Sequence, residues 1–112
     1  MAGEDRIVGH VDLRAHPTPG MVHRCLLGMG VHREWRRSGI GQRLLHVAIE
    51  WAQADQQMEW IDLQVIAANG AAVRLYERAG FTGTGLLRDC FRVDGREVDY
   101  LSMALPVRRS SS

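Results

Sequence analysis

The 112-residue sequence has few cysteines and no long apolar run. Its two cysteines, Cys25 and Cys90, fit neither a metal-binding motif nor a disulfide framework, so we expect reduced thiols in a cytoplasmic protein. No apolar stretch approaches the roughly 18–20 residues of a membrane-spanning helix, and the acidic N-terminus does not resemble a signal peptide. The formal net charge of +1 argues against a nucleic-acid partner, and the scattered histidines predict no metal site.

The order of apolar patterns predicts a single α/β domain over residues 1–105, followed by a frayed tail over 106–112. Alternating or continuous apolar patterns predict strands. Apolar residues three and four apart predict helices. The expected elements are strands at 6–14, 22–31 and 60–66, helices at 40–54 and 71–79, and a closing pair of strands over 81–105. We therefore expect a mixed central sheet of about five strands with two main helices.

Two local patterns make finer predictions. Asp94-Gly95 favours a type I′ hairpin turn, which places Val93 opposite Arg96. Gly28 and Gly30 interrupt an apolar strand, and glycine there often marks a bulge or the close approach of a ligand. In the first helix, the spacing predicts an inner face of Ile40, Leu44, Val47, Ala48, Trp51 and Ala52.

The turn before the first helix carries the strongest chemical signal. It reads Arg36-Arg37-Ser38-Gly39-Ile40-Gly41 and lies between an apolar strand and the helix. A helix N-terminus has unpaired N–H groups and a partial positive charge. Glycines let an anion approach the backbone, and arginines add charge. This turn is therefore typical of a phosphate-binding site.

Three segments, in order, resemble the GNAT superfamily of N-acetyltransferases, in particular its small-molecule and amino-acid acetyltransferases. The first is the Arg36-x-x-Gly39-x-Gly41 turn. The second is Asn69-x-x-Ala72-x-x-Leu75-Tyr76-Glu77-x-x-Gly80-Phe81. The third is the closing hairpin over 85–105. The resemblance covers residues 6–105 but begins at what would be the family's second strand, so we expect an N-terminally shortened GNAT-like fold. A truncated chain, a minimal form and a partner subunit that supplies the absent wall all remain open.

The resemblance implies acetyl-CoA as co-substrate. Its pyrophosphate would lie on the turn formed by Arg36, Arg37, Ser38, Gly39, Ile40 and Gly41. Its pantetheine arm would pair with the backbone of Met29, Gly30 and Val31, because the central parallel strands of this family splay apart. Asn69 matches a position that often contacts the pantetheine arm, although a helix N-cap is an equally good role. Tyr76 is the candidate catalytic acid, because a phenol can protonate the departing thiolate.

The sequence says less about the acceptor substrate and the general base than about the acetyl-CoA site. We expect direct attack by a primary amine of a small molecule or an amino acid. His32, Glu34 and Asp62 are candidates for the general base, and none is singled out. A non-catalytic acyl-CoA-binding or interaction module is the alternative. The sheet edge left by the absent first strand predicts a homodimer, because an unpaired edge invites pairing.

Overall fold

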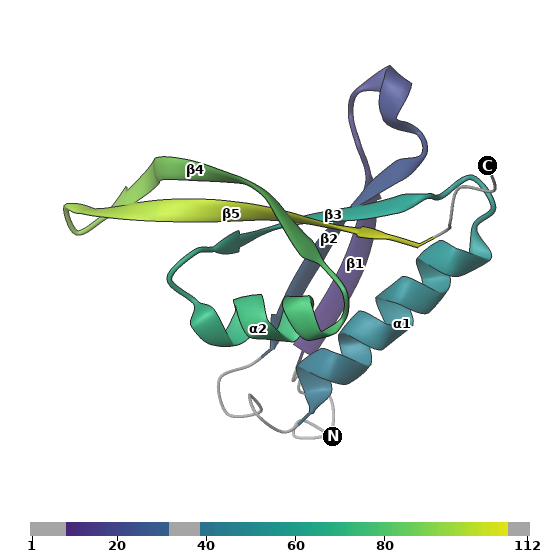
Figure 1. Ribbon diagram of the computed structural model, residues 1–112, viewed down its shortest axis with the longest axis horizontal. Helices are drawn as coiled ribbons and strands as arrows, with labels where there is room; N and C mark the ends of the chain where they lie inside the picture. The colour runs from purple at the N-terminus through teal and green to yellow at the C-terminus, as the bar shows by residue number, and fades with distance from the viewer. Residues whose placement is uncertain (1–8, 32–38, 108–112) are drawn as a thin grey trace, which may run out of the picture.

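A computed structural model describes residues 9–31 and 39–107 of the chain (Figure 1). The elements follow the predicted order, with one added turn of 3-10 helix between the first two strands. In chain order they are β1 (Gly9–Ala15), η2 (Pro19–Met21), β2 (Arg24–Val31), α1 (Ile40–Ala54), β3 (Trp60–Ile66), α2 (Gly70–Arg78), β4 (Thr82–Val93) and β5 (Arg96–Pro106).

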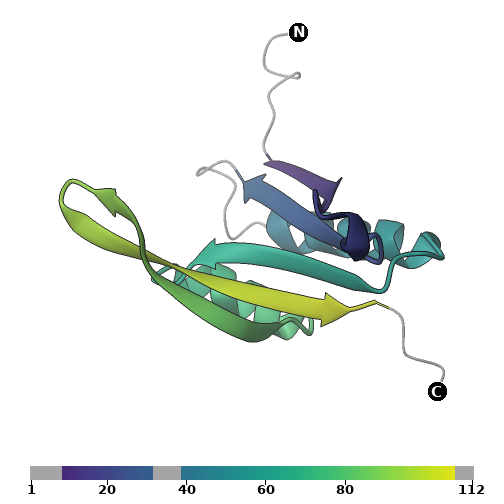
Figure 2. The same ribbon diagram turned by 90° about the horizontal axis from the view of Figure 1, so that it is seen from above.

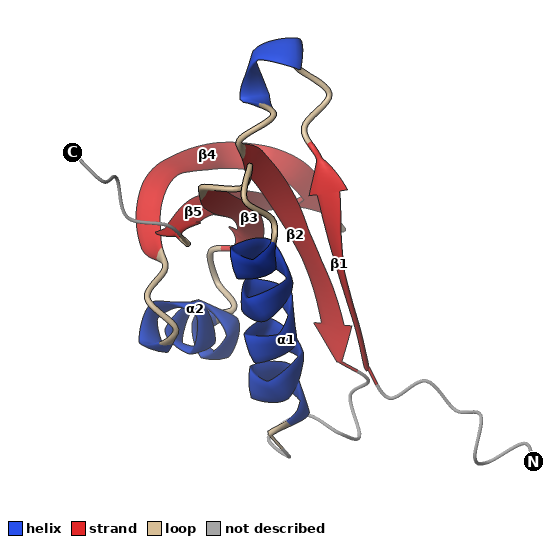
Figure 3. Cartoon of the chain, turned by 90° about the vertical axis from the view of Figure 1, so that its right-hand side faces the viewer, coloured by secondary structure: helices blue, strands red, loops and turns tan. Residues whose placement is uncertain are grey.

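The five strands form one mixed sheet in the order β1-β2-β3-β5-β4. β2 and β3 are parallel because α1 carries the chain back between them, and every other neighbouring pair is antiparallel. Both helices lie on the same side of the sheet (Figure 3). The predicted mixed sheet with two helices is thus confirmed, and it has a helix-covered face and an opposite face.

The core lies between the helices and the sheet, because alternate strand residues point toward α1 and α2. Leu45, Ala48 and Ala52 form the buried stripe of α1. They pack in one cluster with strand residues such as Ile61 and Met103. The expected inner face of this helix was therefore partly wrong. Trp51 is 52% exposed and Val47 is 36% exposed, whereas Leu45, which the pattern did not select, is only 2% exposed.

The closing hairpin has the predicted register. Val93 pairs with Arg96, and the two turn residues, Asp94 and Gly95, both have positive φ angles, of 52° and 77°. A type I′ turn requires positive φ at both central positions, which suits this dipeptide. Figure 2 shows that the hairpin extends well beyond the rest of the sheet.

The C-terminal end of the domain differs slightly from the expectation. Pro106, where the tail was expected to begin, still belongs to β5 and pairs with Trp60. The Val107 N–H then donates a hydrogen bond of 2.9 Å to the carbonyl of Glu59. The remainder of the predicted tail, 108–112, lies outside the described residues.

Two further properties of the described residues concern membrane spans and metal ions. None of their helices is long and apolar enough to span a membrane. They contain no group of three or more His, Cys, Asp or Glu side chains arranged to hold a metal ion.

Candidate active site

The two parallel strands separate part of the way along their length. β2 and β3 are paired only from Arg24 opposite Trp60 to Leu26 opposite Asp62. Beyond that point β2 stays paired with β1 as far as Val31, and β3 stays paired with β5 as far as Ile66. Figure 2 shows β2 and β3 diverging toward their carboxyl ends. The splay that the family resemblance implies is therefore present.

The splay leaves unpaired backbone groups in the middle of the sheet. Among the described residues, 27–31 of β2 have no strand partner on the side that faces β3. Backbone N–H and C=O groups need hydrogen-bond partners, and an extended ligand with amide groups can supply them as an added strand. The predicted Met29, Gly30 and Val31 lie in this stretch, and the Met29 side chain packs against the core.

The N-terminus of α1 adjoins the end of β2. Gly9, which pairs with Val31, lies against the side chains of Ile40 and Leu44 in the first turns of the helix. The N-cap is Gly39 in a left-handed conformation with φ of 85°, which suits glycine. No side chain caps this helix N-terminus within the part of the chain that the structure describes. Its first N–H groups therefore remain available to an anion.

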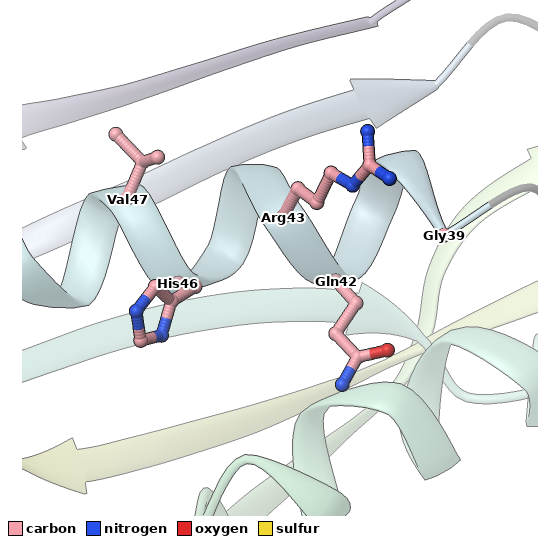
Figure 4. A pocket seen from close by; sticks show the side chains of 5 residues that line it. All are labelled: Gly39, Gln42, Arg43, His46 and Val47. Carbon is pink, nitrogen blue, oxygen red and sulfur yellow. The ribbon is translucent and has the colours of Figure 1, made fainter.

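A shallow hollow of about 630 Å³ runs along the first two turns of α1 (Figure 4). Arg43 extends from this helix back toward its N-terminus, as helical side chains do. The sequence pattern did not assign most of this hollow to the site, because an exposed helix face carries no signal beyond polarity. The hollow is lined by Gly39, Gln42, Arg43, His46 and Val47.

Two predicted site residues belong to α2. The Asn69 side chain accepts a hydrogen bond of 3.2 Å from the Ala72 N–H, which confirms its N-cap role. Tyr76 is 8% exposed and its ring meets Phe81 edge to face, with centroids 5.8 Å apart. Burial raises the pKa of the Tyr76 phenol, so it holds its proton at neutral pH. Whether Asn69 also contacts a ligand stays a prediction.

Several predicted residues lie outside the described residues. They are Arg36, Arg37 and Ser38 of the turn, and His32 and Glu34 among the candidate bases. Of the predicted turn, the structure describes Gly39, Ile40 and Gly41, at the start of α1.

Asp62, the remaining base candidate, is engaged by the side chains of Arg24 and His16. Arg24 donates to both of its carboxylate oxygens, at 2.7 and 2.5 Å, and His16 Nε2 lies 3.0 Å from Oδ2. Burial raises the pKa of Asp62, but its hydrogen bonds with Arg24 and His16 outweigh this and leave the pKa below its ordinary value. A carboxylate of low pKa is a weak proton acceptor, so this arrangement disfavours Asp62 as the base.

The two cysteines are free, as predicted. Cys25 is buried, and desolvation, with smaller contributions from Asp62 and Asp55, raises the pKa of its thiol to about 11. The thiol therefore stays protonated at neutral pH. This protonation makes Cys25 a poor nucleophile and agrees with direct transfer to the acceptor.

The bulge expected at Gly28 and Gly30 is absent, and the close approach of a ligand there stays a prediction. The pairing of β1 with β2 continues without a register shift, so there is no bulge. A Cβ atom on Gly30 would lie 2.7 Å from His10 Cε1, and one on Gly28 would overlap the Asp12 carboxylate. The glycines therefore accommodate cross-strand side chains, which a sequence pattern cannot show before the register is known.

Comparisons with known proteins agree with this geometry. The sequence model of the Acetyltransferase (GNAT) family matches residues 2–81. The [Ribosomal protein bS18]-alanine N-acetyltransferase of Escherichia coli (strain K12) is 37% identical over 84 residues, covering 73% of this chain and 55% of that protein. The L-amino acid N-acetyltransferase AaaT of the same strain is 26% identical over 98 residues, covering 88% of this chain and 60% of AaaT.

A solved structure has the same fold. The protein yncA of Salmonella typhimurium, determined with its cofactor acetyl-CoA, superposes with a TM-score of 0.87 at 21% identity. The match covers 97% of this chain and 63% of that one. The chain thus spans little more than half the length of the two relatives.

Proposed function

Because the chain belongs to the Acetyltransferase (GNAT) family, we propose that it is an N-acetyltransferase that moves an acetyl group from acetyl-CoA to a primary amine. The acceptor we propose is a small molecule or an amino acid. The observation that carries the proposal is the splay of β2 from β3 beside the uncapped N-terminus of α1. This combination offers a strand edge to an extended amide-bearing arm and N–H groups to a phosphate.

The donor would be held by backbone rather than by a deep cavity. We assign the pantetheine amides to the free edge of Met29, Gly30 and Val31, in the manner of an added strand. Asn69 would contact the same arm while it caps α2. This placement is supported by the lack of any other partner for that edge of β2 within 9–31 and 39–107.

The pyrophosphate would lie at the start of α1. Gly39, Ile40 and Gly41 would supply backbone N–H groups, and the left-handed Gly39 would keep side-chain bulk away from the phosphates. Arg36, Arg37 and Ser38 complete the proposed turn. A charged hydrogen bond contributes about 1.5–3 kcal/mol, so several of them would hold the donor firmly.

The transfer itself is a single displacement. The amine nitrogen loses a proton to water and bonds to the thioester carbonyl carbon, and the carbon–sulfur bond breaks. Tyr76 would give its phenolic proton to the departing thiolate and recover one from solvent. The role of acid is compatible with the protonation state of Tyr76, because burial raises the pKa of its phenol and the phenol is protonated when the thiolate leaves.

We also propose a cytoplasmic homodimer. Within the described sheet β1 pairs only with β2, which leaves one edge of β1 for a second copy. The two free cysteines agree with a reducing compartment. Sedimentation velocity at tens of micromolar should show a dimer, and a pure monomer would remove this part of the proposal.

Two measurements on the full chain test the activity. Calorimetry should detect acetyl-CoA binding, and a thiol-release assay over a panel of primary amines should detect transfer. Binding followed by no release with any amine would favour the alternative, a non-catalytic acyl-CoA-binding or interaction module. A chain that binds no acetyl-CoA would contradict both functions.

A further inference from the structure

The sheet face opposite the helices carries a polar wall on one side of the splay. His10 and Asp12 of β1 stand directly across from Gly30 and Gly28 of β2. Because these two positions lack a Cβ, both side chains lie over β2 rather than beside it. An imidazole and a carboxylate thus reach toward the gap between β2 and β3.

Asp12 has an unused acceptor in this wall. Its Oδ2 atom accepts a hydrogen bond of 3.1 Å from Arg14 Nε, a pair that is largely exposed. Its Oδ1 atom is buried and has no hydrogen-bond partner among the described residues. A carboxylate oxygen without a donor is costly. The Asp12 side chain as a whole is 42% exposed, so its carboxylate group is open to a donor from outside.

The other side of the splay carries an apolar wall on the same face. Ile66 of β3 pairs with Tyr100 of β5, and Phe91 of β4 meets Tyr100 edge to face with ring centroids 5.1 Å apart. Ile66 is 45% exposed and Phe91 is 51% exposed. No described helix covers them, because both helices lie on the opposite face of the sheet (Figure 3).

The register places His10 at the level of Ile66 and Tyr100. Counting equal steps along each strand from the last parallel pair, Leu26 and Asp62, brings Gly30 level with Ile66. His10 is therefore level with Ile66, and Asp12 lies two residues nearer the closed end of the splay. The gap between them is the gap assigned above to the pantetheine arm.

We infer that the acceptor is a primary amine that carries an apolar or aromatic substituent. Its ammonium group binds the Asp12 carboxylate beside His10, and its substituent lies on Ile66 and Tyr100. This inference rests on the proposed function and narrows its substrate class. Charge complementarity selects the ammonium, and the exposed aliphatic and aromatic surface selects the substituent. Amines with charged or very small substituents gain only the contact between the ammonium group and Asp12.

Phenylalanine amide and glycine amide are the probes, because they share the ammonium and carboxamide groups and differ in the side chain. In the thiol-release assay, the kcat/KM for phenylalanine amide should be at least about tenfold higher than the kcat/KM for glycine amide. Ile66→Thr, which keeps a β-branched side chain in the strand, should narrow this ratio. Equal use of the two amides would overturn the apolar half of the inference.

Asp12→Asn tests the polar half. It should raise the KM for phenylalanine amide about tenfold or more while the affinity for acetyl-CoA stays the same. Glu59→Gln is the matched control, because it removes an exposed carboxylate immediately before β3 and should leave both values unchanged. An unchanged acceptor KM in Asp12→Asn would overturn the assignment of the ammonium site.

Acceptor binding can be followed without turnover. Phenylalanine amide added to CoA-saturated protein should shift the NMR amide resonances of Gly28 and Ile66, whereas glycine amide should shift only that of Gly28. Binding of this kind with no thiol release would retain the inference and contradict the proposed transfer. The absence of any shift would overturn the inference, whether or not other amines are acetylated.

Discussion

Leu26 and Asp62 are the last residues through which β2 and β3 stay paired, and the side chain of Asp62 is fastened there by Arg24 and His16. The closed end of the splay is therefore tied across three segments of the chain: the loop after β1, β2 and β3. Arg24 also lies over the Trp60 ring, 4.9 Å from its centroid. This network holds the two strands together at the point where they begin to separate.

The stability of this network should depend on pH. The pKa of Asp62 is lower in the folded chain than its unfolded value of about 3.9. Its contribution is therefore present above about pH 4 and is lost as the pH falls through the folded pKa. Asp62→Asn should lower the free energy of unfolding by about 1–3 kcal/mol at neutral pH, because charged hydrogen bonds are lost. Urea titrations at several pH values would measure this difference.

The difference in unfolding free energy between wild type and Asp62→Asn should begin to narrow below about pH 4. It should continue to narrow as the pH falls through the lower folded pKa, where wild-type Asp62 becomes neutral in the folded chain. Glu59→Gln changes an exposed residue directly before β3, the strand that contains Asp62. It should alter the free energy of unfolding by less than about 0.5 kcal/mol at any pH. If the difference in unfolding free energy between Asp62→Asn and wild type stayed constant with pH, the charge of Asp62 would not be what stabilises the network.

Tyr76→Phe tests the proposed acid. The ring would keep its place against Phe81, so the fold should remain intact. Turnover should fall at least about tenfold, which corresponds to about 1.4 kcal/mol, with little change in acetyl-CoA affinity. Steady-state kinetics with calorimetry on the same preparation separates the two quantities, and unchanged turnover would remove Tyr76 from the mechanism.

Asn69 has one observed role and one proposed role, and two variants separate them. Asn69→Ala removes the N-cap of α2 and should cost about 1 kcal/mol of stability. Asn69→Asp keeps a capping oxygen and should retain stability, but it loses the amide N–H₂ donors and should weaken acetyl-CoA binding. If Asn69→Asp binds acetyl-CoA as tightly as wild type, the cap is its whole role.

The close fit of Gly28 against Asp12 predicts a measurable coupling. Gly28→Ala would place a methyl group against the Asp12 carboxylate and should destabilise the fold by about 1 kcal/mol. In an Asp12→Ala background the same methyl group meets no obstacle, so its cost should largely disappear. A double-mutant cycle in urea measures this coupling, and additive effects would show that the two positions are independent.

Much of the fold could be predicted from the sequence because its local signals agree with its tertiary structure. Asp94-Gly95 alone sets the hairpin register, and Asn69 with Gly80 brackets α2. The inner face of α1 could not be resolved, because Leu45 and Val47 are both apolar and both fall on helical spacings. Only packing against the sheet decides which of them is buried.

The site was less accessible to sequence reasoning. The splay after Leu26 has no local signature, and it was implied only by the family resemblance. The meaning of Gly28 and Gly30 depends on which residues of β1 lie opposite, and register between strands is a tertiary property. His10 and Asp12 were therefore missed, although the His-x-Asp spacing matches Gly-x-Gly across the pair.

Backbone hydrogen exchange tests the central claim most directly, that the free edge of β2 binds the arm of acetyl-CoA. When the cofactor saturates the protein, amides of 27–31 that face β3 should exchange at least about tenfold more slowly, as should those of the first turn of α1. Amides within the paired strands β3 and β5 serve as the internal control. Unchanged exchange over 27–31 in a chain that demonstrably binds acetyl-CoA would contradict the account.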